Sequence, residues 1–81
     1  MPEPHADRLL DCRRTLCPMP VVRTSQEMRT LAPGQVLKVL ATDRGAIVDI
    51  PAWANDTGNE LVDWHEDGQD LVFLIRKGEE A

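Results

Sequence analysis

The hydrophobic positions of this chain repeat at two different intervals. In residues 7–12, Leu10 and Cys12 fall on the same side of an extended segment, which predicts a first strand. Residues 35–42 alternate and are rich in β-branched and aliphatic side chains, which predicts a second, buried strand. Between them, from Pro18 to Ala32, the repeat changes to a helical one.

The predicted first helix has its hydrophobic positions on one side. Val21, Met28 and Leu31 recur at helical spacing, with small polar residues between them. Pro33-Gly34 directly after the segment is a helix-stop signal. A strand, a helix and a second strand in this order form a β-α-β unit, which pairs its strands in parallel.

A second helix is predicted after Asp43, whose side chain can cap its first turn. Its hydrophobic stripe consists of Ile47, Ile50, Trp53 and Ala54. Pro51 removes one backbone donor and should kink or loosen this helix. Residues 55–59 have the composition of a turn.

The last part of the chain predicts a hairpin. Residues 60–66 alternate, residues 70–77 are strongly apolar, and Asp67-Gly68 between them is a strong hairpin signal. The whole order, β-α-β-α-β-β, predicts an α+β two-layer sandwich with two helices on one face of a four-stranded mixed sheet. We expect one domain over residues 7–78, with a disordered tail at 1–6 and a C-terminal tail at 79–81.

Composition narrows the class of protein. With 42% hydrophobic and 28% charged residues among 81, the chain has the make-up of an ordinary globular domain. The start of the chain has no signal-peptide pattern and no apolar run approaches the length of a membrane span, so we expect a cytoplasmic protein without membrane contact. Neither histidine stands at metal-ligand spacing from a cysteine and there is no phosphate-binding glycine motif, so we expect no metal and no cofactor.

The charge is negative overall and unevenly distributed. The net charge is −5, of which residues 1–44 carry +2 and residues 45–81 carry −7. A nucleic-acid-binding module usually presents a dense basic face, so direct RNA binding has little support. Any basic docking site should lie in the first half of the chain.

The chemistry of the sequence centres on Cys17, which is followed by Pro18 and Pro20. Prolines suit the first turn of a helix, where backbone N–H groups have no partner inside the helix. With Cys17 as the N-cap, the N–H groups of Met19 and Val21 would be the donors to its sulfur. The helix dipole could then lower the pKa of the thiol from about 8.5 to roughly 7.5, which suits reversible sulfur exchange.

Other cysteine chemistries fit less well. A thioredoxin-type motif needs a second cysteine three residues after the first, and that position is Pro20. No histidine is placed for a Cys-His dyad, since His5 precedes the first strand and His65 is in a distant one. Cys12 is interpreted as a small core residue, with a resolving thiol that forms a Cys12–Cys17 disulfide as the alternative.

These residues resemble a known family. Cys-Pro-Met-Pro after a strand that ends in Leu-Asp, with the segments PGQVLKV, ATD and DIP downstream, is similar to the TusA (SirA-like) sulfur-carrier family from about Leu9 to Gly78. The resemblance implies a two-layer α/β sandwich like the C-terminal domain of translation initiation factor three. It also implies a sulfurtransferase whose Cys17 carries sulfane sulfur as a persulfide.

The resemblance further implies partners and pathways. The sulfur would come from a cysteine desulfurase or a rhodanese-like protein and pass to an acceptor protein, toward 2-thiouridine in tRNA, molybdenum cofactor or sulfur oxidation. We expect a monomer. A non-catalytic binding or regulatory module, using the same helix start only as a docking surface, is the alternative from a different class.

The chain departs from the family pattern at two positions. Many members have glycine three residues before the cysteine, where this chain has Arg14, and often a polar residue where it has Met19. Arg14 fits only if the backbone there tolerates a side chain. Met19 would give the loop a more apolar rim. Arg13, Arg14 and Arg23 are candidates for contacts with a sulfur anion or an acidic partner.

Three further features carry a structural interpretation. Asp49-Ile50-Pro51 matches a family segment and is interpreted as shaping the second helix. Trp53 and Trp64 are interpreted as packing residues, with partner contact as the alternative.

Overall fold

The structure is a computed structural model, which describes residues 5–16 and 18–79. Its elements follow in the order β1 (Arg8–Cys12), α1 (Met19–Met28), β2 (Val36–Ala41), α2 (Ala46–Thr57), β3 (Glu60–Asp67) and β4 (Asp70–Arg76). The predicted order β-α-β-α-β-β is confirmed. Most of the two predicted tails, residues 1–4 and 80–81, lies outside the described residues.

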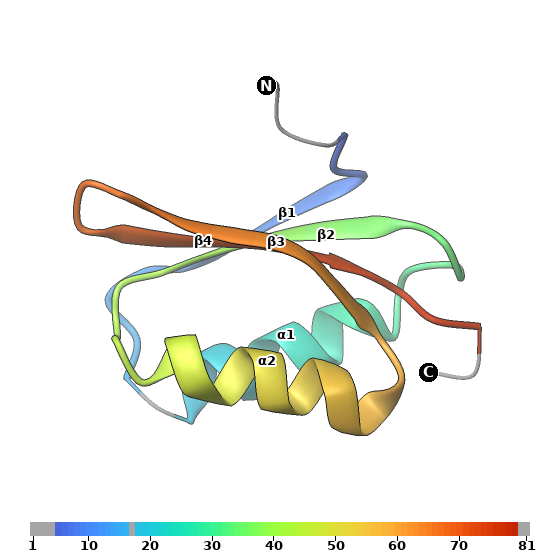
Figure 1. Ribbon diagram of the computed structural model, residues 1–81, viewed down its shortest axis with the longest axis horizontal. Helices are drawn as coiled ribbons and strands as arrows, with labels where there is room; N and C mark the ends of the chain where they lie inside the picture. Colours follow the sequence, from blue (N-terminus) through green and yellow to red (C-terminus); the bar gives the residue numbers. More distant parts are fainter. Residues whose placement is uncertain (1–4, 17, 80–81) are drawn as a thin grey trace.

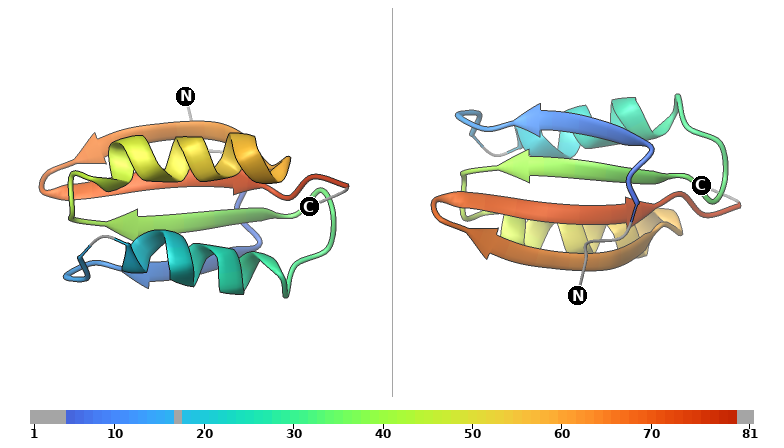
Figure 2. Two further views of the ribbon diagram at one scale, coloured as in Figure 1. Left: turned by 90° about the horizontal axis from the view of Figure 1, so that it is seen from below. Right: turned by 90° about the horizontal axis from the view of Figure 1, so that it is seen from above.

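The four strands form one mixed sheet in the order β1-β2-β4-β3. β1 and β2 are parallel, whereas β4 is antiparallel to both β2 and β3. Both helices cover the same face of the sheet, with α1 over β1 and β2 and α2 over β4 and β3 (Figures 1 and 2). The predicted two-layer sandwich is therefore confirmed.

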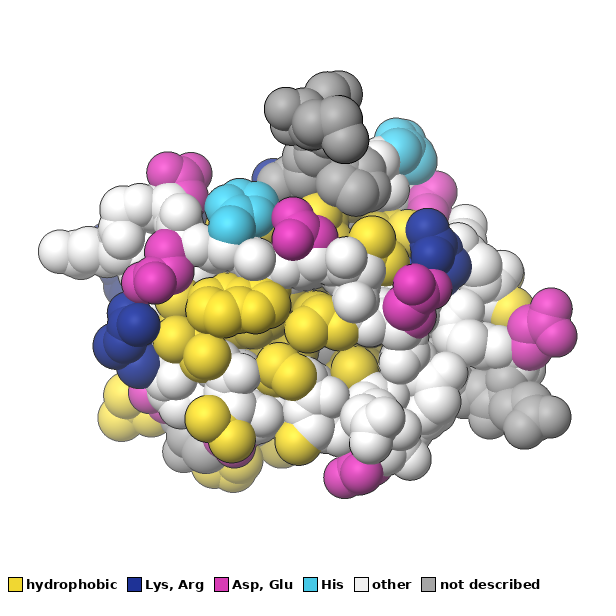
Figure 3. Space-filling view, viewed as in Figure 1, with side chains coloured by type: hydrophobic (Ala, Val, Ile, Leu, Met, Phe, Trp, Pro, Cys, Tyr) yellow, Lys and Arg dark blue, Asp and Glu magenta, His cyan; other side chains and the backbone are white. Residues whose placement is uncertain are grey.

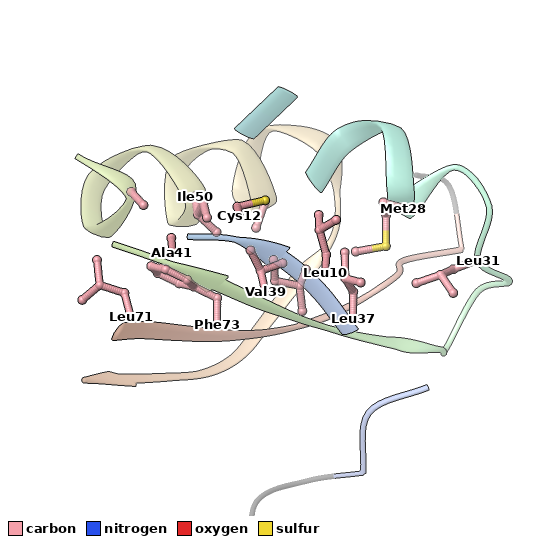
Figure 4. Packing of buried hydrophobic residues seen from close by; sticks show 13 residues of the cluster. Leu10, Cys12, Met28, Leu31, Leu37, Val39, Ala41, Ile50, Leu71 and Phe73 are labelled. Atoms are coloured by element: carbon pink, nitrogen blue, oxygen red, sulfur yellow. The ribbon is translucent and has the colours of Figure 1, made fainter. Parts of the chain in front are cut away.

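The core lies between this face and the helices (Figure 4). Alternate residues of the two central strands point into it because side chains along a strand alternate between faces. Val39 on β2 lies directly opposite Phe73 on β4, and both are fully buried. From β1 the core receives Leu10 and Cys12, as the spacing predicted.

α1 is shorter than the predicted span, because it ends at Met28 and not near Ala32. The Thr30 hydroxyl and the Thr30 N–H both donate to the Glu27 carbonyl, at 2.7 and 3.0 Å. A Leu31 N–H bond to the Met28 carbonyl at 3.2 Å continues this tighter turn. The threonine hydroxyl thus competes with the regular helical ladder before the Pro33-Gly34 stop signal is reached.

α2 begins later and ends later than predicted. Gly45 is its N-cap, while the Asp43 carboxylate accepts a bond from the Gly45 N–H at 3.1 Å and so shapes the preceding turn. Pro51 stands inside the helix without ending it. The end comes at Gly58, in the left-handed conformation that favours glycine, so Asn55 to Thr57, predicted as turn, are helical.

The predicted hairpin is confirmed. Asp67 pairs with Asp70 across a turn in which Gly68 has a φ of 63°. Trp64 pairs with Phe73, and their rings stack with centroids 6.0 Å apart and planes 18° from parallel. Trp64 thus packs as interpreted, although 37% of it stays exposed at the edge of the sheet.

Hydrophobic side chains gather on the surface between β3 and α2, with acidic side chains at the border (Figure 3). Val48 on α2 and Trp64 on β3 are two of the large hydrophobic residues that the fold leaves exposed. Trp53 is half-buried against the core, in line with its packing interpretation. Within residues 5–16 and 18–79, no helix is long and apolar enough to cross a membrane.

Candidate functional site

The candidate site is the loop that joins β1 to α1, residues 13–18. It leaves the sheet where the parallel strands β1 and β2 end, beside the β2–α2 connection and the β3–β4 turn (Figure 2). Cys17, the predicted reactive residue, lies outside the described residues. The residues on both sides of it define the environment that the fold builds there.

A set of short hydrogen bonds holds the first part of this loop. The Arg13 N–H donates to Asp11 Oδ1 at 3.0 Å, and the Thr15 hydroxyl donates to the Cys12 carbonyl at 2.6 Å. The Arg14 N–H donates to Thr42 Oγ1, in the β2–α2 connection, at 2.9 Å. The chain that leads to Cys17 is therefore tied both to its own strand and to the neighbouring loop.

Arg14 has an unusual backbone conformation. Its φ is 67°, and it is the one non-glycine residue of the described chain with a positive φ. This left-handed region favours glycine because a Cβ atom crowds the following carbonyl. The backbone at this position therefore has a conformation that favours glycine, and many members of the family that this sequence resembles have glycine there. In this chain the position is occupied by Arg14, whose side chain is exposed.

The helix start differs by one residue from the prediction. Pro18 is the N-cap, Met19 is the first helical residue, and Pro20 is at the second position. The Met19 N–H donates to the Leu16 carbonyl at 2.8 Å, and the Pro18 carbonyl accepts the Val22 N–H at 3.1 Å. The prediction that Cys17 is the N-cap, with Pro18 first and Pro20 third, is therefore wrong. The Met19 N–H, expected to face the sulfur, is engaged by Leu16 because a tight turn precedes the helix.

One part of the surface at the loop and the first turn of α1 is apolar, as expected from the presence of Met19. Leu16 is 76% exposed, and Met19 and Val22 are 44% and 38% exposed. Pro20 is buried, and Val21 is half-buried against the core, so these two residues anchor the helix start. The loop thus presents hydrophobic side chains on a rigid base.

The three candidate arginines have different surroundings. The Arg13 guanidinium binds both oxygens of Asp11, at 3.0 and 2.9 Å, and reaches Asp70 on β4 at 3.3 Å. These bonds lower the pKa of Asp11 to about 2 and raise that of Arg13. The charge of Arg23 also contributes to the lowered pKa of Asp11. Arg14 has no hydrogen-bonded or ion-paired side-chain partner within the described ranges.

Cys12 is a core residue. It is fully buried at the end of β1 (Figure 4), and burial raises the pKa of its thiol. A buried, protonated thiol is a poor nucleophile, which favours the core interpretation over a resolving role.

Most residues around the hollow beside the loop were not singled out from the sequence. Asp11, Thr42 and Asp70 join Arg13, Arg14 and Gln69 around a hollow of about 580 Å³ beside the loop. Asp11 follows directly from the end of its strand, but Thr42 and Asp70 are 28 and 57 residues away from their partners, so no local pattern could reveal them. In the described part of the chain, no three His, Cys, Asp or Glu side chains are placed to hold a metal ion.

Comparison with known proteins gives the family. The family model described as sulfurtransferase TusA matches residues 8–77, nearly the whole described chain. The chain belongs to the TusA family. The resemblance read from Cys-Pro-Met-Pro and its surrounding segments is thereby confirmed.

Individual relatives agree with this assignment. YrkI of Bacillus subtilis is 44% identical over 73 residues, which are 90% of this chain and 97% of YrkI. The sulfur carrier protein TusA of Allochromatium vinosum is 42% identical over 71 residues, covering 88% of this chain and 93% of that protein. The fold is similar to the crystal structure of a SirA-like protein from Desulfitobacterium hafniense, with a TM-score of 0.78, 23% identity and coverage of 89% and 99%. These relatives support membership of the TusA family, and the SirA-like structure shows the same fold.

Proposed function

We propose that this TusA-family protein carries sulfur as a persulfide on Cys17. In the proposed step, the Cys17 thiolate attacks the outer sulfur of a donor persulfide. A new S–S bond forms at Cys17, the donor S–S bond breaks, and the donor cysteine leaves as a thiolate with the electron pair. Repetition of the step toward an acceptor thiol passes the sulfur on, without net oxidation or reduction.

The observation that carries this proposal is the position of the Cys-Pro-Met-Pro segment between a buried strand end and a helix start. α1 begins at Met19 and has no acidic residue in its first turn. The stretch from Cys12 to Gln26 contains three arginines and no carboxylate. Because Asp11 and Asp70 neutralise Arg13, the helix terminus and the exposed charge of Arg14 are the features that favour a thiolate or persulfide anion in this loop.

The donor in this proposal is a cysteine desulfurase or a rhodanese-like protein, and the acceptor is a second protein. Thiolation of tRNA, molybdenum-cofactor assembly and sulfur oxidation are the candidate destinations. The exposed hydrophobic residues Leu16, Met19 and Val22 support contact with proteins. A carrier that depends on a free thiol needs a reducing compartment, so the proposed location is the cytoplasm.

The test is sulfur loading followed by intact-mass measurement. With a purified cysteine desulfurase and cysteine, the wild-type protein should gain the mass of one sulfur atom, and dithiothreitol should remove it. C17S should gain none, whereas C12A should load like wild type. Loading of C17S, or no loading of the wild type, would contradict the proposal.

The exposed hydrophobic residues Leu16, Met19 and Val22 would also suit the alternative function, a docking or regulatory module without sulfur chemistry. That alternative predicts full function of C17S in cells and no persulfide on the isolated protein. Complementation with C17S, combined with the mass measurement, separates the two.

A further inference from the structure

Arg14, the residue of the loop with a strained backbone, also carries a positive charge that no carboxylate of the described chain neutralises. Arg14 holds a φ of 67°, in the region that disfavours residues with a Cβ atom. Backbone strain of this kind concentrates at functional sites, where the surrounding structure enforces it. Here the bond from the Arg14 N–H to Thr42 Oγ1 is one of the contacts that hold it.

Arg13 and Arg14 are neighbours in sequence but differ in their electrostatics. Asp11 and Asp70 neutralise Arg13 through hydrogen bonds of 2.9 to 3.3 Å. The guanidinium of Arg14 meets no carboxylate among residues 5–16 and 18–79, and its side chain is exposed. Within this loop, Arg14 is therefore the described residue whose positive charge can pair with a partner protein.

Arg14 lies three residues before Cys17 in the sequence, close enough to belong to the same protein interface. Three residues span at most about 11 Å. A standard protein interface covers about 800 Å² on each partner, which corresponds to a radius of roughly 16 Å. An interface of this size centred on Cys17 therefore extends to Arg14, Leu16 and Met19.

The chemistry of this surface indicates a protein partner rather than a nucleic acid. Arginine and methionine beside apolar side chains are typical of protein interfaces. The chain as a whole carries −5, and its second half carries −7, so an extended phosphate backbone would be repelled. A single exposed arginine next to a hydrophobic rim fits a carboxylate beside an apolar surface.

Building on the proposed function, we propose that Arg14 is a specificity-determining residue of the sulfur exchange. It pairs with a carboxylate on the sulfur-donor protein, while Leu16 and Met19 contact an apolar surface around the donor cysteine.

The experiment compares R14G, R14Q and R29Q with wild type, using a purified cysteine desulfurase as the probe. R14G removes both charge and strain, R14Q removes only the charge, and R29Q removes one charge at the far end of α1. The readouts are the Kd for the desulfurase at low and high salt, the initial rate of sulfur loading, and the thermal midpoint of each carrier.

We expect R14G and R14Q to bind about tenfold more weakly at low salt and to load correspondingly slowly, with a smaller difference at high salt. R29Q should behave like wild type. R14G should also melt a few degrees higher than R14Q, because glycine accepts the left-handed backbone. A higher thermal midpoint of R14G together with slower sulfur loading would not result if Arg14 had only a structural role.

Equal Kd and loading for R14Q and wild type would overturn this inference, as would an equal loss in R29Q. Arg14-dependent binding of tRNA at physiological salt would also overturn it, because the partner would then be a nucleic acid. Failure of the proposed function looks different, since the wild type would then gain no sulfur. The Kd comparison still decides the role of Arg14 in that case.

Discussion

The backbone N–H of Arg14 donates to the hydroxyl of Thr42 at 2.9 Å and ties the β1–α1 loop to the β2–α2 connection. This bond links two segments that follow adjacent parallel strands, and it holds Arg14 in its left-handed conformation. The segment that leads to Cys17, the proposed sulfur-carrying residue, is thus held in part by a residue 28 places further along the chain.

Replacing Thr42 by valine should weaken the attachment of the β1–α1 loop to the β2–α2 connection. T42V keeps the shape of the side chain but removes the acceptor, so the free energy of unfolding should fall by about 1 kcal/mol. Urea unfolding followed by tryptophan fluorescence measures the change. T42S, which keeps a hydroxyl, should retain most of the stability, and equal losses in T42S and T42V would show that the hydrogen bond is not the cause.

The same change at Thr24 on α1 should have the opposite effect and stabilise the fold. Its side chain is fully buried, and its hydroxyl has no hydrogen-bond partner in the described structure. A buried hydroxyl without a partner costs free energy, so T24V should raise the free energy of unfolding by up to about 1 kcal/mol. In a domain of this size, 1 kcal/mol corresponds to a thermal midpoint roughly 4–8 °C higher.

The matched control for Thr24 is T24S. It keeps the unpartnered hydroxyl and removes a buried methyl group, so it should be less stable than wild type. A stabilised T24S together with a destabilised T24V would mean that the hydroxyl makes a favourable interaction.

Cys12 should be almost unreactive in the folded protein. C17S leaves it as the remaining thiol of the chain, fully buried and with a raised pKa. Reaction with Ellman's reagent should then require unfolding and be slower by roughly 1,000-fold or more than in guanidinium chloride. C12A, which leaves Cys17, should react rapidly without denaturant, and a fast native reaction of C17S would restore Cys12 as a candidate resolving thiol.

The Asp11–Arg13 contact should appear in the acid stability. Because the pKa of Asp11 falls from 3.8 to about 2 on folding, its ionised form stabilises the fold above pH 4. This contribution is lost as the pH falls toward 2. Thermal midpoints between pH 2 and 6 should therefore show wild type above D11N at pH 5, with the difference vanishing near pH 2.

The effect of Asp11 should be modest, since the pair is solvent-exposed and screened. D56N, near the end of α2, is a control that also removes one carboxylate. A D11N difference that stays constant from pH 2 to 6 would show that ionisation of Asp11 is not its origin.

The sequence was sufficient for the elements, the fold class and the family. Strand and helix periods, the Asp67-Gly68 turn and the position of Leu10 and Cys12 on one face are local properties, and local properties can be read from neighbouring residues. The two-layer sandwich followed because a helix between two strands imposes a parallel crossover. The Cys-Pro-Met-Pro segment pointed to the family that the comparisons confirmed.

Tertiary structure decided how the candidate site is built. Whether α1 begins at Pro18 or at Met19 depends on the Leu16 carbonyl, which takes the Met19 N–H in a preceding turn. Arg13 and Arg14 look alike in the sequence, but Asp70 and Thr42 approach them from distant segments and give them different roles. Contacts of this kind depend on how the sheet aligns its strand ends, and no periodic pattern along the chain encodes that alignment.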